Sequence, residues 1–324
     1  MIPMCYSAMV KQSIKQLGLT YQARVQLDAF EELFELRAKG SGAKIPRAME
    51  LSFGKPENAQ EKRIWKLIEI WHAHQIETYE KELFEQRKRL GDAEQKIKLK
   101  ETKVALNEKR ISSEKILKLK ARLKDLSRDI PDEYARIFPH MVSPLMIEKN
   151  DERIIMPFRY HLRPFGQEPE FDRKFDGTYN ARRDRLREVF WWKSIFGKNH
   201  GVLVISKFWE NISLSRYEHR SLKEGEVDQN IVLEFKPEGL SEMLIPCIFD
   251  HNQSGEFSLN SFALITDEPN PEIAAAGHDR TPILMKEEHL DRWLKTSGKS
   301  LSDFEVVFDD KQPSFFEHSI ASGI

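Results

Sequence analysis

The chain has 324 residues, of which 40% are hydrophobic and 32% are charged. Its 51 Lys and Arg nearly balance its 52 Asp and Glu, and the net charge of −1 excludes nucleic-acid binding by bulk positive charge, so any such contact needs a local basic patch. Two cysteines, Cys5 and Cys247, exclude a disulfide scaffold and a four-cysteine zinc site, and they suit a reducing cytoplasm.

The N-terminal zone, residues 1–54, predicts one short amphipathic helix near Leu27–Ala38. Its apolar residues recur at helical intervals, at positions Leu27, Phe30, Leu33 and Phe34. The segment 39–46 (KGSGAKIP) that follows is typical of a loop. This zone is too short to form a core alone, so we expect it to pack with a later part of the chain.

Residues 55–130 predict helix almost throughout, with a break at Gly91. Segment 92–129 contains 12 Lys or Arg and 7 Asp or Glu, and a narrow apolar stripe runs through it, at Ile97, Val104, Ile111, Ile116, Leu119, Leu123 and Leu126. A narrow stripe with charged flanks is typical of a coiled-coil hairpin, and arms of roughly 32–38 residues would measure about 50–57 Å. A protein partner or the DNA backbone are candidate ligands of this hairpin, but a charge run is most often only a solvated face. His72 and His74 point to different helix faces and do not make a metal site.

After residue 131 the pattern changes to short β-like runs separated by turn residues. The expected strands are Leu145–Glu148, Arg153–Met156, Gly201–Ile205, Ile231–Phe235, Met243–Phe249 and Phe262–Thr266. One helix is expected at Glu287–Leu294. The fold class is therefore α+β, with a mainly antiparallel β core, peripheral helices and an inserted long helical hairpin. We expect residues 1–54 and 131–324 to form one catalytic domain and 55–130 to form the insert. Cys247 lies in an apolar run and is expected to be buried.

Four motifs along the chain carry candidate chemistry. They are Met4-Cys5, Asn180–Asp184 (NARRD), Phe208-Trp209-Glu210 and His278–Pro282 (HDRTP). Each alone has an ordinary structural explanation: a buried cysteine, a turn residue, an edge-strand pair and a loop histidine. Their order and spacing are more specific than any one of them.

Together these motifs resemble the SOS response-associated peptidase (SRAP) family, whose members process abasic sites in DNA. The resemblance covers about residues 4–35 and 134–300, and it implies an SRAP-like fold. The chain departs from the family pattern where Tyr6 follows the cysteine, at Asp184 and at Asn211. The implied catalytic residues are Cys5, Asn180, Glu210 and His278, with Met4 as the processing position.

The resemblance also implies a role for each of these groups. A free α-amine and thiol on Cys5 would trap the aldehyde of a ring-opened abasic sugar as a thiazolidine. Glu210 would act as general acid and base, and His278 would assist ring opening and proton transfer. Asn180 would hold the amine or the sugar by hydrogen bonds. Because Met1–Met4 blocks the amine, we expect that translation starts at Met4 or that the protein cleaves Met4–Cys5 itself, and we favour the first. The alternative is that Cys5 stays internal and the chain is inactive.

Basic and aromatic residues cluster around the second motif. The implied DNA-binding residues are Arg159, Arg163, Arg182, Arg183 and Trp209. Arg182 would bind a phosphate through hydrogen bonds from its planar guanidinium group. The interleaved aromatic rings would stack on bases, as in grooves that bind single-stranded DNA. The alternative to a DNA-binding groove is that these basic residues form a solvent-exposed charged face over a core strand.

The leading hypothesis is covalent capture of abasic sites in single-stranded DNA in the DNA damage response, with autopeptidase activity and an associated strand-nicking lyase activity. A second hypothesis is a thiol autopeptidase or peptide hydrolase that forms no DNA adduct. A third is a coiled-coil adaptor on a degenerate SRAP scaffold. We expect no cofactor, no metal and no membrane association. We expect the protein in the cytoplasm, associated with the nucleoid when it is bound to DNA.

Overall fold

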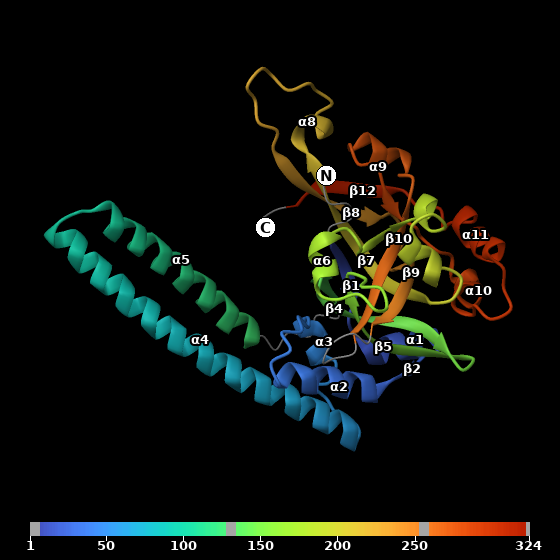
Figure 1. The fold of residues 1–324 in the computed structure, drawn as a ribbon, viewed down its shortest axis with the longest axis horizontal. Coiled ribbons are helices and arrows are strands. Elements are labelled where there is room, and N and C mark those ends of the chain that lie inside the picture. The colour runs from blue at the N-terminus through green and yellow to red at the C-terminus, as the bar shows by residue number, and fades with distance from the viewer. Residues whose placement is uncertain (1–6, 128–133, 253–258, 322–324) are drawn as a thin grey trace. The chain divides into compact units, whose positions relative to one another are not determined.

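The computed structural model describes residues 7–127, 134–252 and 259–321 (Figure 1). The chain divides into two compact units. The first, which we call the sheet unit, comprises Met1–Phe30, Ala43–Ser52 and Asp132–Ile324. The second, the helical unit, comprises Glu31–Gly42 and Phe53–Pro131. The helical unit therefore takes in a segment near residue 40 as well as the long helices.

The sheet unit contains, in its described part, a mixed sheet of 12 strands. Most neighbouring strands are antiparallel, whereas β10 runs parallel to β5 and β6, and β2 runs parallel to β5. The strands are β1 (Ser7–Lys11), β2 (Arg24–Val25), β3 (Tyr134–Ile137), β4 (Val142–Lys149), β5 (Glu152–Tyr160), β6 (Asn180–Arg182), β7 (His200–Ser213), β8 (Asn230–Pro237), β9 (Met243–Asn252), β10 (Leu259–Asp267), β11 (Thr281–Pro282) and β12 (Phe316–Ile320).

Five of these strands pair in a closed ring. β10 pairs with β5, β5 with β4, β4 with β7, β7 with β9, and β9 again with β10. Because side chains alternate along a strand, Leu203 and Ile205 of β7 face the same apolar cluster as Ile245 and Cys247 of β9. The expected burial of Cys247 is confirmed, since its side chain is fully buried.

Strand β7 connects this ring to the rest of the sheet. Its first half pairs with β9, and its second half pairs with β8 on one side and β1 on the other. Trp209 lies opposite both Ser7 of β1 and Glu234 of β8. The motif Phe208-Trp209-Glu210 therefore lies on a central strand, where neighbours on both sides fix its position.

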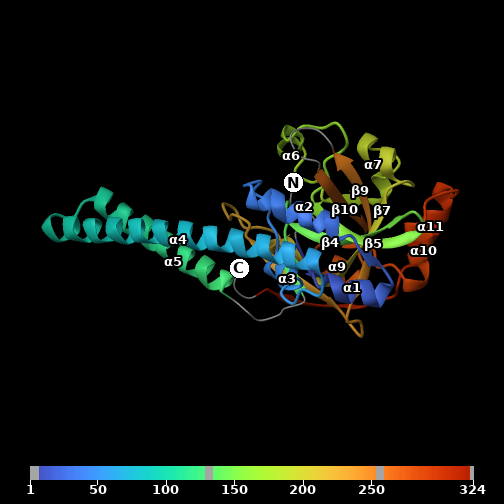
Figure 2. The same ribbon diagram turned by 90° about the horizontal axis from the view of Figure 1, so that it is seen from below.

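Short helices surround the sheet unit. Trp293 of α10 packs edge-on against Phe304 of α11, and both rings are fully buried. In Figure 2, α6 and α7 lie over the same end of the sheet, where Phe171 contacts Trp191. The helices outside the hairpin are α1 (Ile14–Tyr21), α2 (Leu27–Ala38), α3 (Arg47–Leu51), α6 (Glu170–Lys174), α7 (Phe190–Ile195), α8 (Leu214–Tyr217), α9 (Pro271–Ala275), α10 (Leu290–Leu294) and α11 (Leu301–Asp309), with 3-10 turns at Arg183–Arg185 and Glu287–His289.

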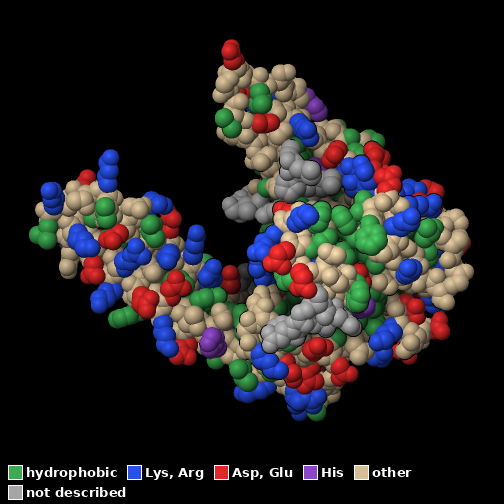
Figure 3. Space-filling model, viewed as in Figure 1, with side chains coloured by type: hydrophobic (Ala, Val, Ile, Leu, Met, Phe, Trp, Pro, Cys, Tyr) green, Lys and Arg blue, Asp and Glu red, His purple; other side chains and the backbone are tan. Residues whose placement is uncertain are grey.

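The helical unit is dominated by two antiparallel helices, α4 (Ala59–Leu99) and α5 (Lys103–Leu126). Each begins at a side-chain cap: Asn58 accepts a hydrogen bond from the amide of Glu61, and Thr102 accepts one from the amide of Ala105. Charged side chains of both signs lie on the face of this unit that Figure 3 shows. At about 1.5 Å per residue, α4 is about 62 Å long and α5 about 36 Å.

The expected break at Gly91 is wrong, and so are the expected arm lengths. Gly91 lies inside α4, because a single glycine lowers helix stability by only about 1 kcal/mol relative to alanine and long flanking segments outweigh that. The chain instead turns just before the Thr102 cap. The stripe through Ile97, Val104 and Ile111 therefore crosses the turn: Ile97 and Ile111 are half-buried, and Val104 is 71% exposed. The later part of the stripe is confirmed, since Ile116 and Leu119 are buried.

The fold class is confirmed as α+β, and all six expected strands occur within strands of the sheet. The expected helix Leu27–Ala38 is α2, with the same bounds. The expected helix at Glu287–Leu294 is a 3-10 turn that continues into α10. Across the described ranges, none of the helices combines the length and the apolarity that a membrane span requires.

Candidate active site

The central pair of the site is Glu210 of β7 and His278, which follows α9. Glu210 Oε2 lies 3.3 Å from His278 Nε2, and both side chains are buried. His278 Nδ1 lies 2.9 Å from the carbonyl oxygen of Arg280, so we assign the ring proton to Nδ1 as donor to that carbonyl. Burial lowers the pKa of His278 to about 4 and keeps the ring neutral near pH 7. Nε2 then presents its lone pair toward the carboxyl group of Glu210.

The backbone around His278 fixes its position. The amide of His278 donates to the carbonyl of Ile273 at the start of α9. Gly277, at φ +92, occupies a conformation that side chains other than glycine rarely adopt, and a Cβ there would lie 3.1 Å from Arg216 Cβ. Helix α8, which carries Arg216, and the loop that carries His278 therefore pack closely because residue 277 is a glycine.

A cavity of about 510 Å³ opens beside His278. Its walls carry hydroxyl, guanidinium, imidazole and carboxylate groups, from Ser215, Arg216, His219, Arg220, Ser221, Ala274, Gly277, His278 and Asp279. Arg220 is neutralised by Glu218 and Glu226. Arg216 has no ion pair within the ranges that the structure describes, and its charge contributes to the low pKa of His278. Sequence reasoning missed Arg216, because its segment carries no motif.

Asn180 is the first residue of β6, which runs parallel to β10. Its side chain is buried, and the hydroxyl of Tyr160 donates to its Oδ1 at 3.4 Å. Tyr160 is fully buried and lies at the end of β5. The side-chain amide of Asn180 is therefore held by a hydrogen bond from a residue of β5. Tyr160 is a supporting residue that the sequence motifs did not single out.

Trp209 is buried between two cations. The guanidinium of Arg136 lies 4.0 Å from its ring centroid, and the ammonium of Lys207 lies 5.1 Å away. Arg136 Nε also donates to Ser7 Oγ at 2.8 Å, so one arginine joins the first described residue of β1 to the tryptophan. Arg136 has no motif around it and was not expected. With 4% exposure, Trp209 offers little surface for base stacking.

The four arginines expected to bind DNA each form ion pairs within the protein. Arg159 and Arg163 both bind Asp172, with N–O distances of 2.7 and 2.5 Å. Arg182 binds Asp184 at 2.8 Å. Arg183 binds three carboxylates, those of Asp267, Glu305 and Asp309. The positive charge near the second motif is therefore smaller than the sequence count implies, and a phosphate would have to compete with these carboxylates.

Cys5, Met4 and Tyr6 lie outside the described residues. The other cysteine, Cys247, is no alternative nucleophile, because burial raises its thiol pKa well above the ordinary value. The structure thus brings Glu210 and His278 together and ties Asn180 to Tyr160. It leaves the nucleophile as a prediction from the sequence.

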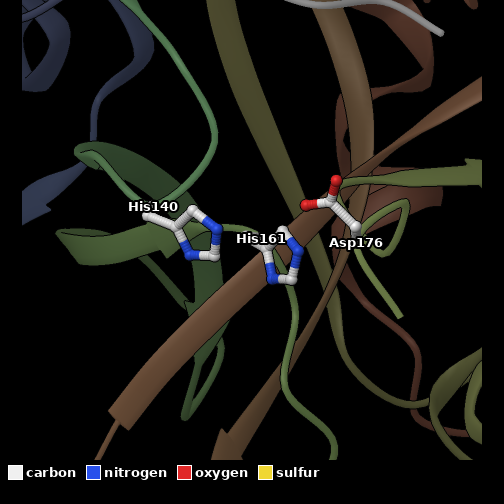
Figure 4. Close-up of side chains that lie close together, drawn as sticks. All are labelled: His140, His161 and Asp176. Carbon is white, nitrogen blue, oxygen red and sulfur yellow. The ribbon is translucent and has the colours of Figure 1, made fainter. Parts of the chain in front are cut away.

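Two groups of side chains in the described ranges have metal-ligand chemistry. His140, His161 and Asp176 bring three donor atoms within 4.8 Å of one another (Figure 4). Glu288, His289 and Asp310 do the same, but Lys286 also binds Asp310 and supplies a competing positive charge. Neither group includes a residue of the four motifs.

Comparison with known proteins gives one family and several structures. A family model described as SOS response associated peptidase (SRAP) matches residues 101–319, which is more than half of the chain. No curated protein matches the chain significantly.

Similar solved structures include three proteins of low sequence identity. One from Bacteroides thetaiotaomicron is 17% identical and has a TM-score of 0.42, covering 55% of this chain and 72% of its own. One from Bordetella bronchiseptica is 16% identical and has a TM-score of 0.45, covering 60% and 90%. A phage-related protein from the same organism is 14% identical and has a TM-score of 0.44, covering 58% and 81%. At these scores the likeness carries no argument about function.

Proposed function

This chain belongs to the SOS response-associated peptidase family, and we propose on that basis that it captures abasic sites in single-stranded DNA through a covalent bond to Cys5. Membership of the family associates the chain with the handling of abasic sites in damaged DNA. The identity of the nucleophile, the nature of the bond and the preference for single strands are our proposal. Action on genomic DNA would place the protein with the nucleoid in the cytoplasm.

The proposed reaction joins the Cys5 aminothiol to the aldehyde of a ring-opened abasic sugar. The α-amine condenses with the aldehyde to form a Schiff base, and one water leaves. The thiol then adds to the carbon of the C=N bond and its proton moves to the nitrogen, which closes a five-membered thiazolidine ring. An internal cysteine lacks the amine, so Met4 must be removed before capture.

The observation that carries the proposal is the buried Glu210–His278 pair next to the strand that follows Cys5. Ser7 lies opposite Trp209, the residue before Glu210. Two extended residues span at most about 7 Å, so chain length alone allows residue 5 to approach this pair from Ser7. A carboxyl group and a neutral imidazole 3.3 Å apart can accept a proton and pass it on.

We assign Glu210 as the group that takes a proton from the Cys5 ammonium and later gives it to the carbinolamine hydroxyl, which leaves as water. His278 supplies the partner for that proton, because Nε2 faces Oε2 and Nδ1 is committed to the Arg280 carbonyl. The same pair supports hydrolysis of the Met4–Cys5 bond, so autopeptidase activity is part of the proposal. Schiff-base formation also makes strand nicking by β-elimination a side reaction.

The cavity beside His278 suits a nucleotide next to the lesion. Its mixed apolar and polar walls match a sugar and a base, and the unpaired Arg216 matches a phosphate. Arg216 has no carboxylate partner within the described ranges, whereas Arg159, Arg163, Arg182 and Arg183 do. We therefore assign Arg216 as a phosphate contact, in addition to the arginines predicted from the motifs.

The test is to mix the protein with single-stranded DNA that contains one abasic site and to separate the products on a denaturing gel. We expect a shifted band from the wild type, no band from Cys5→Ala, and a slow band from Glu210→Gln. Intact mass before mixing reports whether Met1–Met4 has been lost. No band from protein whose mass shows Cys5 at its N-terminus would overturn the proposal.

An undiminished band from Cys5→Ala would overturn the assignment of the nucleophile. Loss of the leader without any DNA adduct would favour the thiol autopeptidase hypothesis. The adaptor hypothesis predicts that Cys5→Ala changes nothing in cells while deletion of the hairpin removes function.

A further inference from the structure

Three side chains outside the proposed active site converge at one edge of the sheet unit. His140 lies in the turn between β3 and β4, His161 follows β5, and Asp176 follows α6. Their donor atoms lie within 4.8 Å of one another, and the carboxylate of Asp176 points toward the two rings (Figure 4). The backbone holds the histidines together, because the amide of His140 donates to the carbonyl of Tyr160, the residue before His161.

The imidazole of His161 has one committed nitrogen and one unused nitrogen. Its side chain is fully buried, and Nε2 has no hydrogen-bond partner among the residues that the structure describes. The ring's hydrogen bond to the Asp176 backbone must therefore be made by Nδ1, which also lies 3.4 Å from Thr178 Oγ1. A histidine whose Nδ1–H is bound to a backbone carbonyl presents the Nε2 lone pair in a fixed direction, which is the usual arrangement of a metal-ligating imidazole.

Both histidines occupy backbone positions that favour glycine. Residues Phe138–Met141 form a turn closed by a hydrogen bond from the Met141 amide to the Phe138 carbonyl, with Pro139 second and His140, at φ 71, third. His161 has a φ of 127. Two neighbouring non-glycine residues in such conformations are strained, and strain of this kind concentrates at functional sites.

Two nearby cations oppose metal binding. The guanidinium of Arg159 is paired with Asp172, and the charge of Lys44 also acts on His140.

We propose that His140, His161 and Asp176 form a binding site for one borderline divalent metal ion, with Zn²⁺ as the best match. Two imidazoles and one carboxylate are a common zinc ligand set, and the exposure of Asp176 leaves an entry path and a fourth position for water. The two rings stack with centroids 4.2 Å apart. Because zinc lies about 2.0–2.2 Å from each ligand, binding must rotate these rings so that their nitrogens converge.

The test measures metal binding and does not depend on DNA capture. A Cys5→Ala chain is used throughout, because a free aminothiol would itself bind zinc. Titration of this chain with ZnCl₂ in a calorimeter should give one saturable site, and CoCl₂ should give the visible absorption of a low-symmetry site. We expect His161→Ala and Asp176→Asn each to weaken zinc binding by at least about tenfold. His289→Gln, in the second cluster, is the matched control and should leave zinc binding unchanged.

The variant His140→Gly separates a binding role from a structural role. Glycine is the preferred residue at φ 71, so this variant should fold with an unchanged or higher melting temperature, yet it should lose most of the zinc affinity. No saturable binding to the Cys5→Ala chain would overturn the proposal. Binding that survives His161→Ala and Asp176→Asn, or that is lost with His289→Gln, would overturn it as well.

Discussion

The sheet unit buries more ionisable side chains than the helical unit does. The sheet unit encloses ionisable groups, including Glu210, His278, His161 and His200, among large aromatic and aliphatic residues. The seam of the hairpin is narrow: its apolar cluster comprises Leu83, Ile116 and Leu119, with Tyr79, Leu90 and Leu123 partly buried against it. Burial shifts the pKa of an ionisable group, whereas solvated charges keep ordinary values. We therefore expect acid–base chemistry in the sheet unit, and binding by the hairpin to a protein partner stays a prediction.

Glu210→Gln should have the largest effect on abasic-site capture, because it removes the buried carboxyl group that we assign as general acid and base in the sheet unit. We expect the rate of abasic-site capture to fall by about 10²–10⁴-fold, the usual range for loss of a general acid or base. The measurement is the single-turnover rate on a denaturing gel. Glu234→Gln, on the neighbouring strand β8, should leave the rate unchanged. A wild-type rate for Glu210→Gln would remove the carboxyl group from the mechanism.

Acid should destabilise the sheet unit, because its buried histidines take up protons only after unfolding. The pKa is about 4 for His161 and His278 and about 3 for His200, all lowered mainly by burial from 6.5. The stability tied to each neutral ring is fully present above pH 6.5 and is lost as pH falls toward the folded pKa. For His278 alone the loss between about pH 7 and about pH 4.5 should be roughly 2 kcal/mol.

Urea unfolding of wild type and His278→Gln at the two pH values checks this expectation. The variant should lose less stability on acidification than the wild type. Equal losses would mean that His278 is not kept neutral by burial.

Leu119→Ala tests the other half of the comparison, the narrow seam of the hairpin. Leu119 is 2% exposed, and its truncation should lower the free energy of unfolding of the helical unit by about 2 kcal/mol, at the low end for a buried leucine because the cluster is small. Amide hydrogen exchange in α4 and α5 reports this change. Leu117→Ala on the same helix, where the side chain is 68% exposed, is the control. Equal effects of the two variants would mean that the seam is not where the structure places it.

Arg216→Ala should have the smallest of these effects, and it tests whether the cavity beside His278 binds a phosphate of the DNA. Loss of one charge-assisted contact to a phosphate should weaken DNA capture by roughly tenfold at low salt. Arg220→Ala lines the same cavity and is the matched control, because its charge is already neutralised by two glutamates. A neutral methylphosphonate next to the lesion should weaken wild-type capture and add nothing to Arg216→Ala. Full additivity of the two changes would exclude this contact.

The sequence predicted the sheet unit better than the hairpin, for physical reasons. Strands such as Gly201–Ile205 are bounded by turn residues and carry continuous apolar runs, so few alternatives compete. The hairpin turn is set by the Thr102 cap, a weak local signal beside the glycine at residue 91. The family resemblance implied that Glu210 and His278 would lie in one site, and the two side chains lie 3.3 Å apart. The partners of Arg159 and Arg163 were not predictable, because Asp172 reaches them only through tertiary contacts.

The pairing of His140 with His161 could not be foreseen either. The two residues lie 21 positions apart in loops without a motif, and their common position depends on the register of β4 and β5. Arg216 shows the same limit, since it is a binding candidate only because a glycine in another segment allows α8 to pack beside His278.

The most direct test of the central claim is mass spectrometry of the trapped complex after nuclease and protease digestion. The account predicts one modified peptide that begins at Cys5, with the sugar remnant on its first residue in a form stable to reduction by borohydride, as a closed thiazolidine would be. An adduct on an internal lysine, or on a peptide that still carries Met4, would contradict it.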